Sequence, residues 1–303
     1  MTTDFLEYLM EDPQEIERLE RKTDPESVLA QAHWAGLTSG MRIADIGCGP
    51  GLTSSILLDA VQPGGEVVGI DFSVERIAHA RNRYQQDGLL FQQEDFFGDL
   101  TSLGTFDFVW VRFVLEFHRS RATQLVANLN RLVRPGGTLC LIDLDYNCLS
   151  HSGLPERVNE TIQDIVRGLE ESADFDPYAG RHLYGHLYDL GYQDIRLDMT
   201  SHHLIYGELD EAERYNWERK VLVAARRSGC DFARYQGDFN AFAKEFTESF
   251  KDPRRFTYTP LIHCCGRKQN SEWYSSRMNC LPAGSYPDIR RHPVLQKQVC
   301  LIQ

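Results

Sequence analysis

The chain has 303 residues, of which 42% are hydrophobic and 11% aromatic, which is enough for the core of one large domain or two small ones. Its formal net charge of −12 disfavours contact with the phosphate backbone of nucleic acids. Residues 1–22 are acidic where a signal peptide would be basic, and no apolar run approaches about 18 residues, so we expect a cytoplasmic protein without a membrane span.

Strands and helices alternate regularly from residue 41. Apolar segments predict five strands, over 41–47, 66–72, 89–96, 106–114 and 138–146. Helices are predicted between them over 52–61, 74–84 and 121–134. Each connection is long enough for the next strand to return parallel, so this segment is typical of a doubly wound α/β fold with a mostly parallel sheet.

The pattern changes after residue 147. We predict helices over 154–171 and 181–192, a strand over 194–205, polar helical sequence over 208–250 and a last strand over 257–268. Two helical insertions, at about 148–180 and 208–250, would then cover the carboxyl edge of a seven-stranded sheet as a lid. The whole of residues 1–268 is interpreted as a single domain, followed by a poorly ordered tail at 269–303 with no assigned role.

The eight cysteines are scattered, with no Cys-x-x-Cys pair and no grouping with histidine that resembles a ligand set. This spacing predicts neither a zinc site nor a disulfide framework, and we expect no metal. The cysteines are interpreted as reduced, buried or incidental thiols.

The first strand ends in "ADIGCGPG", which has glycine at 47, 49 and 51. A dinucleotide loop of the form G-x-G-x-x-G would need a glycine where Leu52 stands. Asp45 disfavours a pyrophosphate but suits a cationic or zwitterionic ligand. Asp71, at the end of the second strand, is placed to accept from both hydroxyls of a ribose. The pattern therefore indicates a nucleoside ligand without a diphosphate.

Four motifs in order, "DIGCGPG", "GIDFS", "QQEDF" and "LNRLVRPGGTLCLID", resemble the class I S-adenosylmethionine-dependent methyltransferases, especially the small-molecule branch that includes ubiquinone and menaquinone biosynthesis enzymes. The likeness covers about 36–147, and "GHLYDLGYQDIRL" is similar to the family's sixth strand and preceding helix. It implies a Rossmann-like methyltransferase core, S-adenosyl-L-methionine as cofactor and a small-molecule methyl acceptor.

The resemblance implies a role for residues on the methionine side of the cofactor. Gly47, Cys48 and Gly49 would pass under the methionine part, with Asp45 near its ammonium. Arg112 would line the same side through its backbone. The glycines can also be explained as a tight turn, and Arg112 as the partner of a structural ion pair.

The resemblance also implies which residues contact the nucleoside part of the cofactor. Asp71 would take the ribose hydroxyls, and Phe72 would pack on the adenine. Asp95 would accept from the adenine amino group, while the backbone of Phe96 would meet the ring. Asp71 as a helix-capping acid and Asp95 as a surface loop acid remain open alternatives.

Methyl transfer is an in-line displacement, so a base is needed only where the acceptor must lose a proton. After the fourth strand come Glu116 and His118, and after the fifth comes Tyr146, which we take as candidate catalytic residues. His118 is the first choice, although it can instead be a helix-start histidine bonded to backbone or water. Tyr146 would either shape the acceptor pocket or pack under the first insertion. His202 and His203, within a strand, favour a structural role.

Phenylalanines occur at helical spacing at positions 239, 242, 246 and 250. They either belong to the hydrophobic core or line the pocket for the methyl acceptor. In the second case the acceptor is apolar or aromatic. A homodimer is compatible with the sequence. The alternative function is a catalytically silent S-adenosylmethionine-binding scaffold or sensor, while Leu52 argues against a nicotinamide-dependent oxidoreductase.

Overall fold

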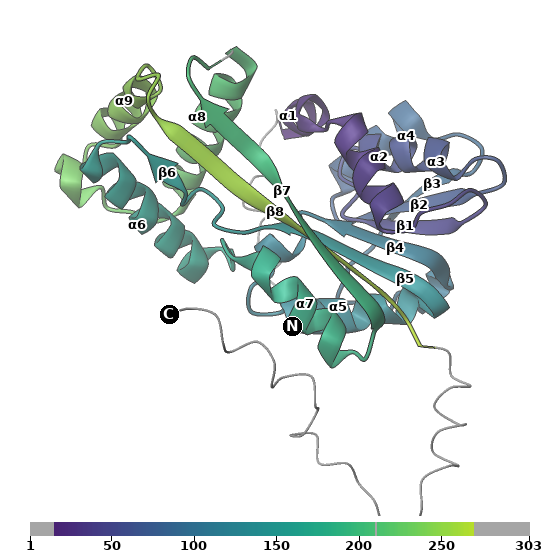
Figure 1. Cartoon of the computed structure of the whole chain (residues 1–303). Coiled ribbons are helices and arrows are strands. Elements are labelled where there is room, and N and C mark those ends of the chain that lie inside the picture. Colours follow the sequence, from purple (N-terminus) through teal and green to yellow (C-terminus); the bar gives the residue numbers. More distant parts are fainter. Residues whose placement is uncertain (1–14, 210, 270–303) are drawn as a thin grey trace, which may run out of the picture. The chain divides into compact units, whose positions relative to one another are not determined.

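The structure is a computed structural model, and it describes residues 15–209 and 211–269 (Figure 1). The elements described below belong to one compact unit that ends at Lys268. The tail that the sequence predicts to be poorly ordered lies, from residue 270 on, outside the described residues.

The sheet contains the five predicted parallel strands and two further long ones. Their bounds are β1 (Arg42–Ile46), β2 (Glu66–Asp71), β3 (Leu89–Gln93), β4 (Phe106–Arg112), β5 (Val133–Leu144), β7 (Gln193–Tyr206) and β8 (Phe256–Arg267). A strand of two residues, β6 (His151–Ser152), was not predicted and makes the sheet eight-stranded. The order is β3-β2-β1-β4-β5-β8-β6, with β7 paired to β8 and with β8 antiparallel to its neighbours. The Rossmann-like, mostly parallel fold is thereby confirmed.

Helices fill most of the connections. Their bounds are α1 (Glu15–Lys22), α2 (Pro25–Trp34), α3 (Leu52–Val61), α4 (Val74–Tyr84), α5 (Ala122–Leu129), α6 (Glu156–Ser172), α7 (Ala179–Asp189), α8 (Glu211–Arg227) and α9 (Phe239–Ser249). Short 3-10 turns are η1 (Thr101–Leu103), η2 (Leu115–Phe117), η3 (Asn130–Leu132) and η4 (Ala233–Tyr235). Sequence analysis did not predict α1 and α2, and it placed the start of the fifth strand too late, because Val133 already pairs with Phe106 ahead of a register shift.

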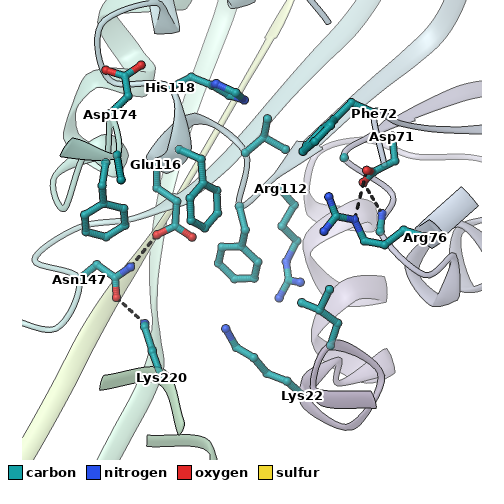
Figure 2. Close-up of a pocket in the computed structure, with 18 of the residues that line it drawn as sticks. Lys22, Asp71, Phe72, Arg76, Arg112, Glu116, His118, Asn147, Asp174 and Lys220 are labelled. Atoms are coloured by element: carbon teal, nitrogen blue, oxygen red, sulfur yellow. Dashed lines mark hydrogen bonds and ion pairs between the residues drawn. The ribbon is translucent and has the colours of Figure 1, made fainter. Parts of the chain in front are cut away.

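Strand order reverses beside β1, which has β2 on one side and β4 on the other. In an open parallel sheet this switch point opens a crevice beyond the carboxyl ends of the strands. The cavity of Figure 2 lies at this edge, bordered by Asp45 of β1, Asp71 of β2 and Arg112 of β4.

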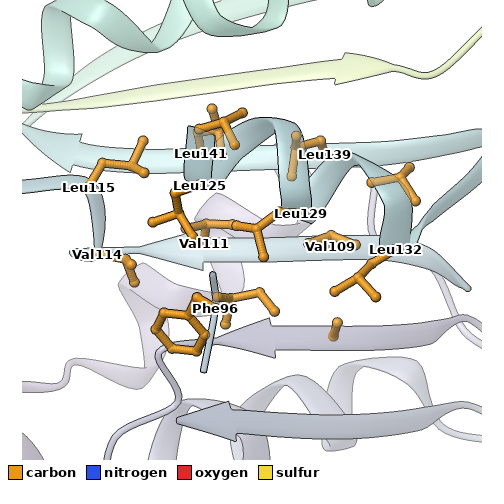
Figure 3. Packing of buried hydrophobic residues seen from close by; sticks show 14 of the residues in the cluster. Phe96, Val109, Val111, Val114, Leu115, Leu125, Leu129, Leu132, Leu139 and Leu141 are labelled. Atoms are coloured by element: carbon orange, nitrogen blue, oxygen red, sulfur yellow. The ribbon is translucent and has the colours of Figure 1, made fainter. Parts of the chain in front are cut away.

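Alternate residues of the central strands build two cores, one on each face of the sheet. Val109 and Val111 face α5 and α7, where Leu125 and Leu129 cover them (Figure 3). Trp110, between the two valines, faces the opposite layer of α2, α3 and α4. A strand that is buried on both faces has apolar residues at consecutive positions, and this pattern predicted β4.

Helices α6, α8 and α9 form a third core, which we call the cap. Phe242 and Phe246 are both 0% exposed and pack against Trp217 and Ile162 in this cluster. The phenylalanine stripe is therefore the inner side of α9, and none of its members lines the cavity. Among the described residues, no helix is long and apolar enough to cross a lipid bilayer.

Candidate functional site

The candidate site is a cavity of about 330 Å³ between the carboxyl ends of the strands, the cap and α1 (Figure 2). Its lining includes all nine residues predicted to bind the cofactor, on the methionine side and on the nucleoside side. These nine are Asp45, Gly47, Cys48, Gly49, Asp71, Phe72, Asp95, Phe96 and Arg112. The structure thus brings together all of the residues that the motifs singled out for the cofactor.

The glycine loop is tied to the end of β2. Gly47 has φ 72°, and a Cβ there would lie 2.5 Å from Cγ2 of Val114, so the close approach of the β4 loop requires glycine. The amide of Gly47 donates to the Ile70 carbonyl at 2.8 Å, and that of Gly49 donates to Oδ2 of Asp71 at 3.0 Å. The loop and Asp71 therefore form one preorganised unit.

Asp71 is 4% exposed and already accepts several hydrogen bonds. Its Oδ1 accepts from the amide of Ser73 at 2.9 Å and from Nε of Arg76 at 3.2 Å, while Oδ2 accepts from the amide of Gly49 at 3.0 Å. A carboxylate has about four lone-pair positions. One acceptor position on Oδ2 thus stays available, enough for one hydroxyl of a ligand without moving Arg76.

The nucleoside side has an apolar wall. The rings of Phe72 and Phe96 meet edge to face, with centroids 6.4 Å apart. Asp95 is exposed, and its Oδ1 accepts from the amide of Phe97 at 2.9 Å, which holds the carboxylate at the rim of the cavity. A flat, partly polar ring fits between such a wall and such an acid.

Asp45 is 2% exposed and accepts from Oγ of Ser54 at 2.6 Å. Burial raises the pKa of Asp45 to about 7, against the opposing hydrogen bond from Ser54. Burial also raises the pKa of the Cys48 thiol well above its usual value, so this thiol stays protonated. Asp45 is therefore a carboxyl that a cationic ligand would ionise.

The side chain of Arg112 reaches from β4 to α2. Its Nε donates to Oε1 of Gln31 in α2 at 3.1 Å, and its guanidinium lies 4.2 Å from the ring centroid of Phe113. Burial lowers the pKa of Arg112 to about 10. The side chain thus links β4 to α2, and a role of the Arg112 backbone in cofactor binding stays a prediction.

Two of the three candidate catalytic residues line the cavity. Burial lowers the pKa of His118 to about 4, against the nearby Asp174 carboxylate, so the ring is neutral at physiological pH. Glu116 is 5% exposed, and burial raises its pKa. Its Oε2 accepts from Nδ2 of Asn147 at 2.6 Å. His118 can accept a proton, while Glu116 is engaged with Asn147.

Tyr146 is not brought to the cavity. Its side chain is 44% exposed, meets the ring of Tyr178 edge to face and lies under the guanidinium of Arg181. Of the other polar residues near the strand ends, His151 bonds to Thr257 and to the Cys148 carbonyl. Tyr146 thus packs against Tyr178 and Arg181 and is not part of the described lining of this cavity.

His202 and His203 lie in β7 and line a second cavity of about 480 Å³. Nδ1 of His203 lies 3.2 Å from Oγ1 of Thr259 across the sheet. Burial lowers the pKa of both histidines well below the usual value. Both rings are therefore neutral. His202 lies against the ring of Phe113 and His203 against that of Trp217 in α8, and their structural role stays a prediction.

Sequence analysis missed three residues at the far side of the first cavity, opposite the acids. Lys22 ends α1, Lys220 lies in α8, and Asn147 follows β5. Nζ of Lys220 donates to Oδ1 of Asn147 at 2.7 Å, and Figure 2 shows both lysine side chains pointing into the space beside Glu116. A cluster of this kind has no local motif, because its members come from three distant segments.

The cap is bonded to the β4 loop. The amide of Asp176 donates to the Glu116 carbonyl at 2.8 Å, and the Asp174 carbonyl accepts from the amide of Arg119 at 2.8 Å. Oδ1 of Asp174 also accepts from the amide of Ser120 at 2.8 Å. These bonds hold the segment after α6 against the wall that carries His118. Within the described residues, no group of three or more His, Cys, Asp or Glu side chains is arranged to hold a metal ion.

Comparison with known proteins places this arrangement in a family. The family described as "Methyltransferase domain" matches residues 37–187. A malonyl-[acyl-carrier protein] O-methyltransferase of Enterobacter lignolyticus is 29% identical over 155 residues, 51% of this chain and 54% of that protein. A ubiquinone biosynthesis O-methyltransferase of Methylococcus capsulatus is 27% identical over 148 residues, 48% of this chain and 60% of that protein. The chain thus spans about half the length of the curated relatives it matches.

A solved structure from Bacillus halodurans C-125, provisionally assigned as a methyltransferase, superposes with a TM-score of 0.51. It is 16% identical to this chain, and the match covers 81% of this chain and 100% of that one. At this identity the likeness concerns the fold alone.

Proposed function

Because this chain belongs to the class I S-adenosylmethionine-dependent methyltransferases, with S-adenosylmethionine as cofactor, we propose that it transfers a methyl group from this cofactor to a small molecule. One observation carries the proposal. The acids at the ends of β1 and β2 and the apolar side chains of the cap line the same cavity, so a cofactor and an acceptor would meet there.

The residues present fit the cofactor. Asp45 is a buried carboxyl whose partner at hydrogen-bond distance, within the part of the chain that the structure describes, is the neutral Ser54, and it would hold the methionine ammonium. Oδ2 of Asp71 would accept one ribose hydroxyl, and Phe72 and Phe96 would contact the adenine. The bound cofactor would supply an electrophilic methyl group on a positively charged sulfur.

The acceptor would lie against the cap. Its side of the cavity is apolar and consists of Ile162, Ile165, Val166, Leu169, Val221 and Ala224. Such a wall favours an acceptor with an apolar or aromatic body, because burial of apolar surface contributes about 25 cal/mol per Å². It also excludes water from the reacting atoms.

The protein's own part in catalysis is mainly to position the acceptor. A neutral His118 would take the proton of an acceptor that must lose one. Glu116, hydrogen-bonded to Asn147, would orient the acceptor rather than serve as the base.

The proposal is tested in two steps on the full chain. Calorimetry measures binding of S-adenosylmethionine and of S-adenosylhomocysteine, and radiolabelled methyl transfer is then followed with a panel of small phenols, amines and carboxylic acids. We expect binding of both cofactor forms and turnover with at least one class. Failure to bind S-adenosylmethionine contradicts the proposal, and so does binding without turnover across the panel.

A further inference from the structure

The two ends of the cavity carry opposite charge. Asp45 and Asp71 lie at the end proposed for the cofactor, whereas Lys22 and Lys220 lie at the end proposed for the acceptor. A sulfonium cofactor explains the acids and leaves the lysines unexplained. The chain as a whole has a net charge of −12, so two lysine side chains in one cavity form a local positive patch. Such a patch favours an anionic ligand.

Among the described residues, Lys22 forms no ion pair, and Glu116 is the carboxylate that attracts its charge. Its ammonium lies 5.0 Å from the ring centroid of Phe113. Burial and the charge of Lys220 hold the pKa of Lys22 well below its usual value. Burial of an ammonium without an ion pair costs free energy, and an anionic ligand beside Lys22 would offset this cost and favour its protonated form.

Lys220 has a neutral partner. Oδ1 of Asn147 accepts one of its three N–H groups at 2.7 Å, and Nδ2 of Asn147 donates to Glu116 at 2.6 Å. The amide thus stands between Lys220 and Glu116, and two N–H groups of Lys220 remain for a ligand. Glu116 carries one charge at most, which cannot neutralise two lysines.

The other carboxylates around the cavity are engaged elsewhere. Asp71 pairs with Arg76, Asp45 accepts from Ser54, Asp95 accepts from the amide of Phe97, and Asp174 accepts from the amide and hydroxyl of Ser120. No described carboxylate other than Glu116 is therefore placed to balance the lysines from within the first cavity.

The second cavity supplies no counter-charge either. It shares Lys22, Lys220, Arg18 and Arg112 with the first, so the cations stand where the two cavities meet. Its two carboxylates are occupied as well. Asp24 caps α2 and accepts from the hydroxyl of Ser27, and Asp198 lies 3.9 Å from Nδ1 of His263.

We propose that Lys22 and Lys220 bind an anionic oxygen group, a carboxylate or a phosphate, of the methyl acceptor. Together with the apolar wall of α6, this makes the acceptor an amphipathic anion. The inference rests on the proposed function, since it names the substrate class of the same site. Two ammonium groups supply up to five free N–H donors, and charge-assisted bonds to them are the strong kind.

The test uses the full chain and three probes of equal length: octanoate, octyl phosphate and octanol. Calorimetry is run with and without S-adenosylhomocysteine. We expect octanoate or octyl phosphate to bind at least about tenfold more tightly than octanol, since a charge-assisted hydrogen bond contributes about 1.5 to 3 kcal/mol. The two anions distinguish a carboxylate from a phosphate as the recognised group.

Variants locate the effect. Lys22→Met and Lys220→Met should each weaken binding of the preferred anion at least about tenfold and leave octanol unchanged. Lys244→Met, on an exposed position of α9 outside both cavities, is the matched control and should change neither. Unchanged binding of S-adenosylhomocysteine by each variant shows that the site is folded.

Octanol binding as tightly as both anions overturns the inference, and so does anion binding that survives both lysine substitutions. Failure of S-adenosylhomocysteine to bind the unaltered chain is a different result, because it contradicts the proposed function. In that case the anion measurements without cofactor still decide whether the lysines form an anion site.

Discussion

The two ends of the cavity are built in different ways. At the end proposed for the cofactor, which we call the cofactor end, the side chains come from one stretch of chain, residues 45–112, and each lies at or just after the carboxyl end of a parallel strand. At the acceptor end they come from α1, α6 and α8, which are joined only in the folded protein. A site built from strand ends can be predicted from local motifs, whereas a site built from helix faces requires the structure.

The ends also differ in their hydrogen bonding. At the cofactor end, Asp45 and Asp71 have partners before any ligand arrives. At the acceptor end, Lys22 has none among the described residues. The first end is preorganised for one ligand, and the second depends on the ligand to complete it.

Phe246→Ala gives the largest expected effect and tests whether the two ends are independent. Phe246 is 0% exposed in the core of the cap, so its truncation should lower the free energy of unfolding by about 3 to 5 kcal/mol. Chemical denaturation measures this loss. Phe256→Ala, at a position 38% exposed, is the control and should cost far less.

The same variant should bind S-adenosylhomocysteine almost as well as the unaltered chain. The reason is that Phe246 does not line the cavity, and the glycine loop packs on the sheet instead of the cap. A tenfold loss of affinity in the folded Phe246→Ala protein would show that the cap and the cofactor end are coupled.

His118→Ala should lower turnover by about 10² and leave cofactor affinity unchanged, if general-base catalysis makes its usual contribution. The pH dependence gives an independent readout. Because burial holds the pKa of His118 at about 4, protonation should abolish its function only as the pH falls toward 4. At saturating cofactor, where the titration of Asp45 in the free protein no longer affects the rate, the rate profile should therefore be flat from about pH 6 to 8. A midpoint near 6.5 that depends on His118, or an unaffected rate in the variant, contradicts this role.

Asp71→Ala should weaken S-adenosylmethionine binding at least about tenfold, because it removes a charge-assisted contact worth about 1.5 to 3 kcal/mol. It also removes the acceptor for the amide of Gly49 and for Nε of Arg76. Asp59→Ala, at an exposed position of α3, is the control. Calorimetry measures both variants, and equal affinities would contradict the assignment of Asp71 to the ribose.

The fold could be predicted where hydrophobic periodicity is strong. The continuous apolar run of β4 and the Ser73 cap of α4 are examples, since Oγ of Ser73 accepts from the amide of Arg76 at 3.3 Å. The sequence analysis missed α2, although Asp24 caps it and Pro25 begins it, a pair typical of a helix start. Strand β6 has only two residues, and its pairing with β8 depends on contacts far away in the sequence.

The candidate site likewise has residues that the sequence predicts and residues that it does not. The residues around the glycine loop were predicted because each occupies a fixed place after a strand. The same reasoning predicted Tyr146 to lie at the cavity because it follows the fifth strand. In the structure Tyr146 has φ 52°, and its ring packs against that of Tyr178. Lys22 and Lys220 were missed because no sequence spacing links α1 to α8. A charged side chain without an ion-pair partner can be recognised only in the folded structure, which shows the residues around it.

Asp45 gives the smallest expected effect, and it tests the cofactor end alone. Burial raises the pKa of Asp45 to about 7 in the free protein, so at pH 7 the carboxyl is about half protonated. A methionine ammonium beside it would favour the charged form. Binding of S-adenosylmethionine at pH 7 should therefore release about half a proton, rising toward about one near pH 5.5 and falling toward zero near pH 8.5. Calorimetry in buffers of different ionisation enthalpy measures this release. Asp45→Asn should abolish it, and a release that this variant leaves unchanged would assign the proton to another group, the cofactor's own amine included.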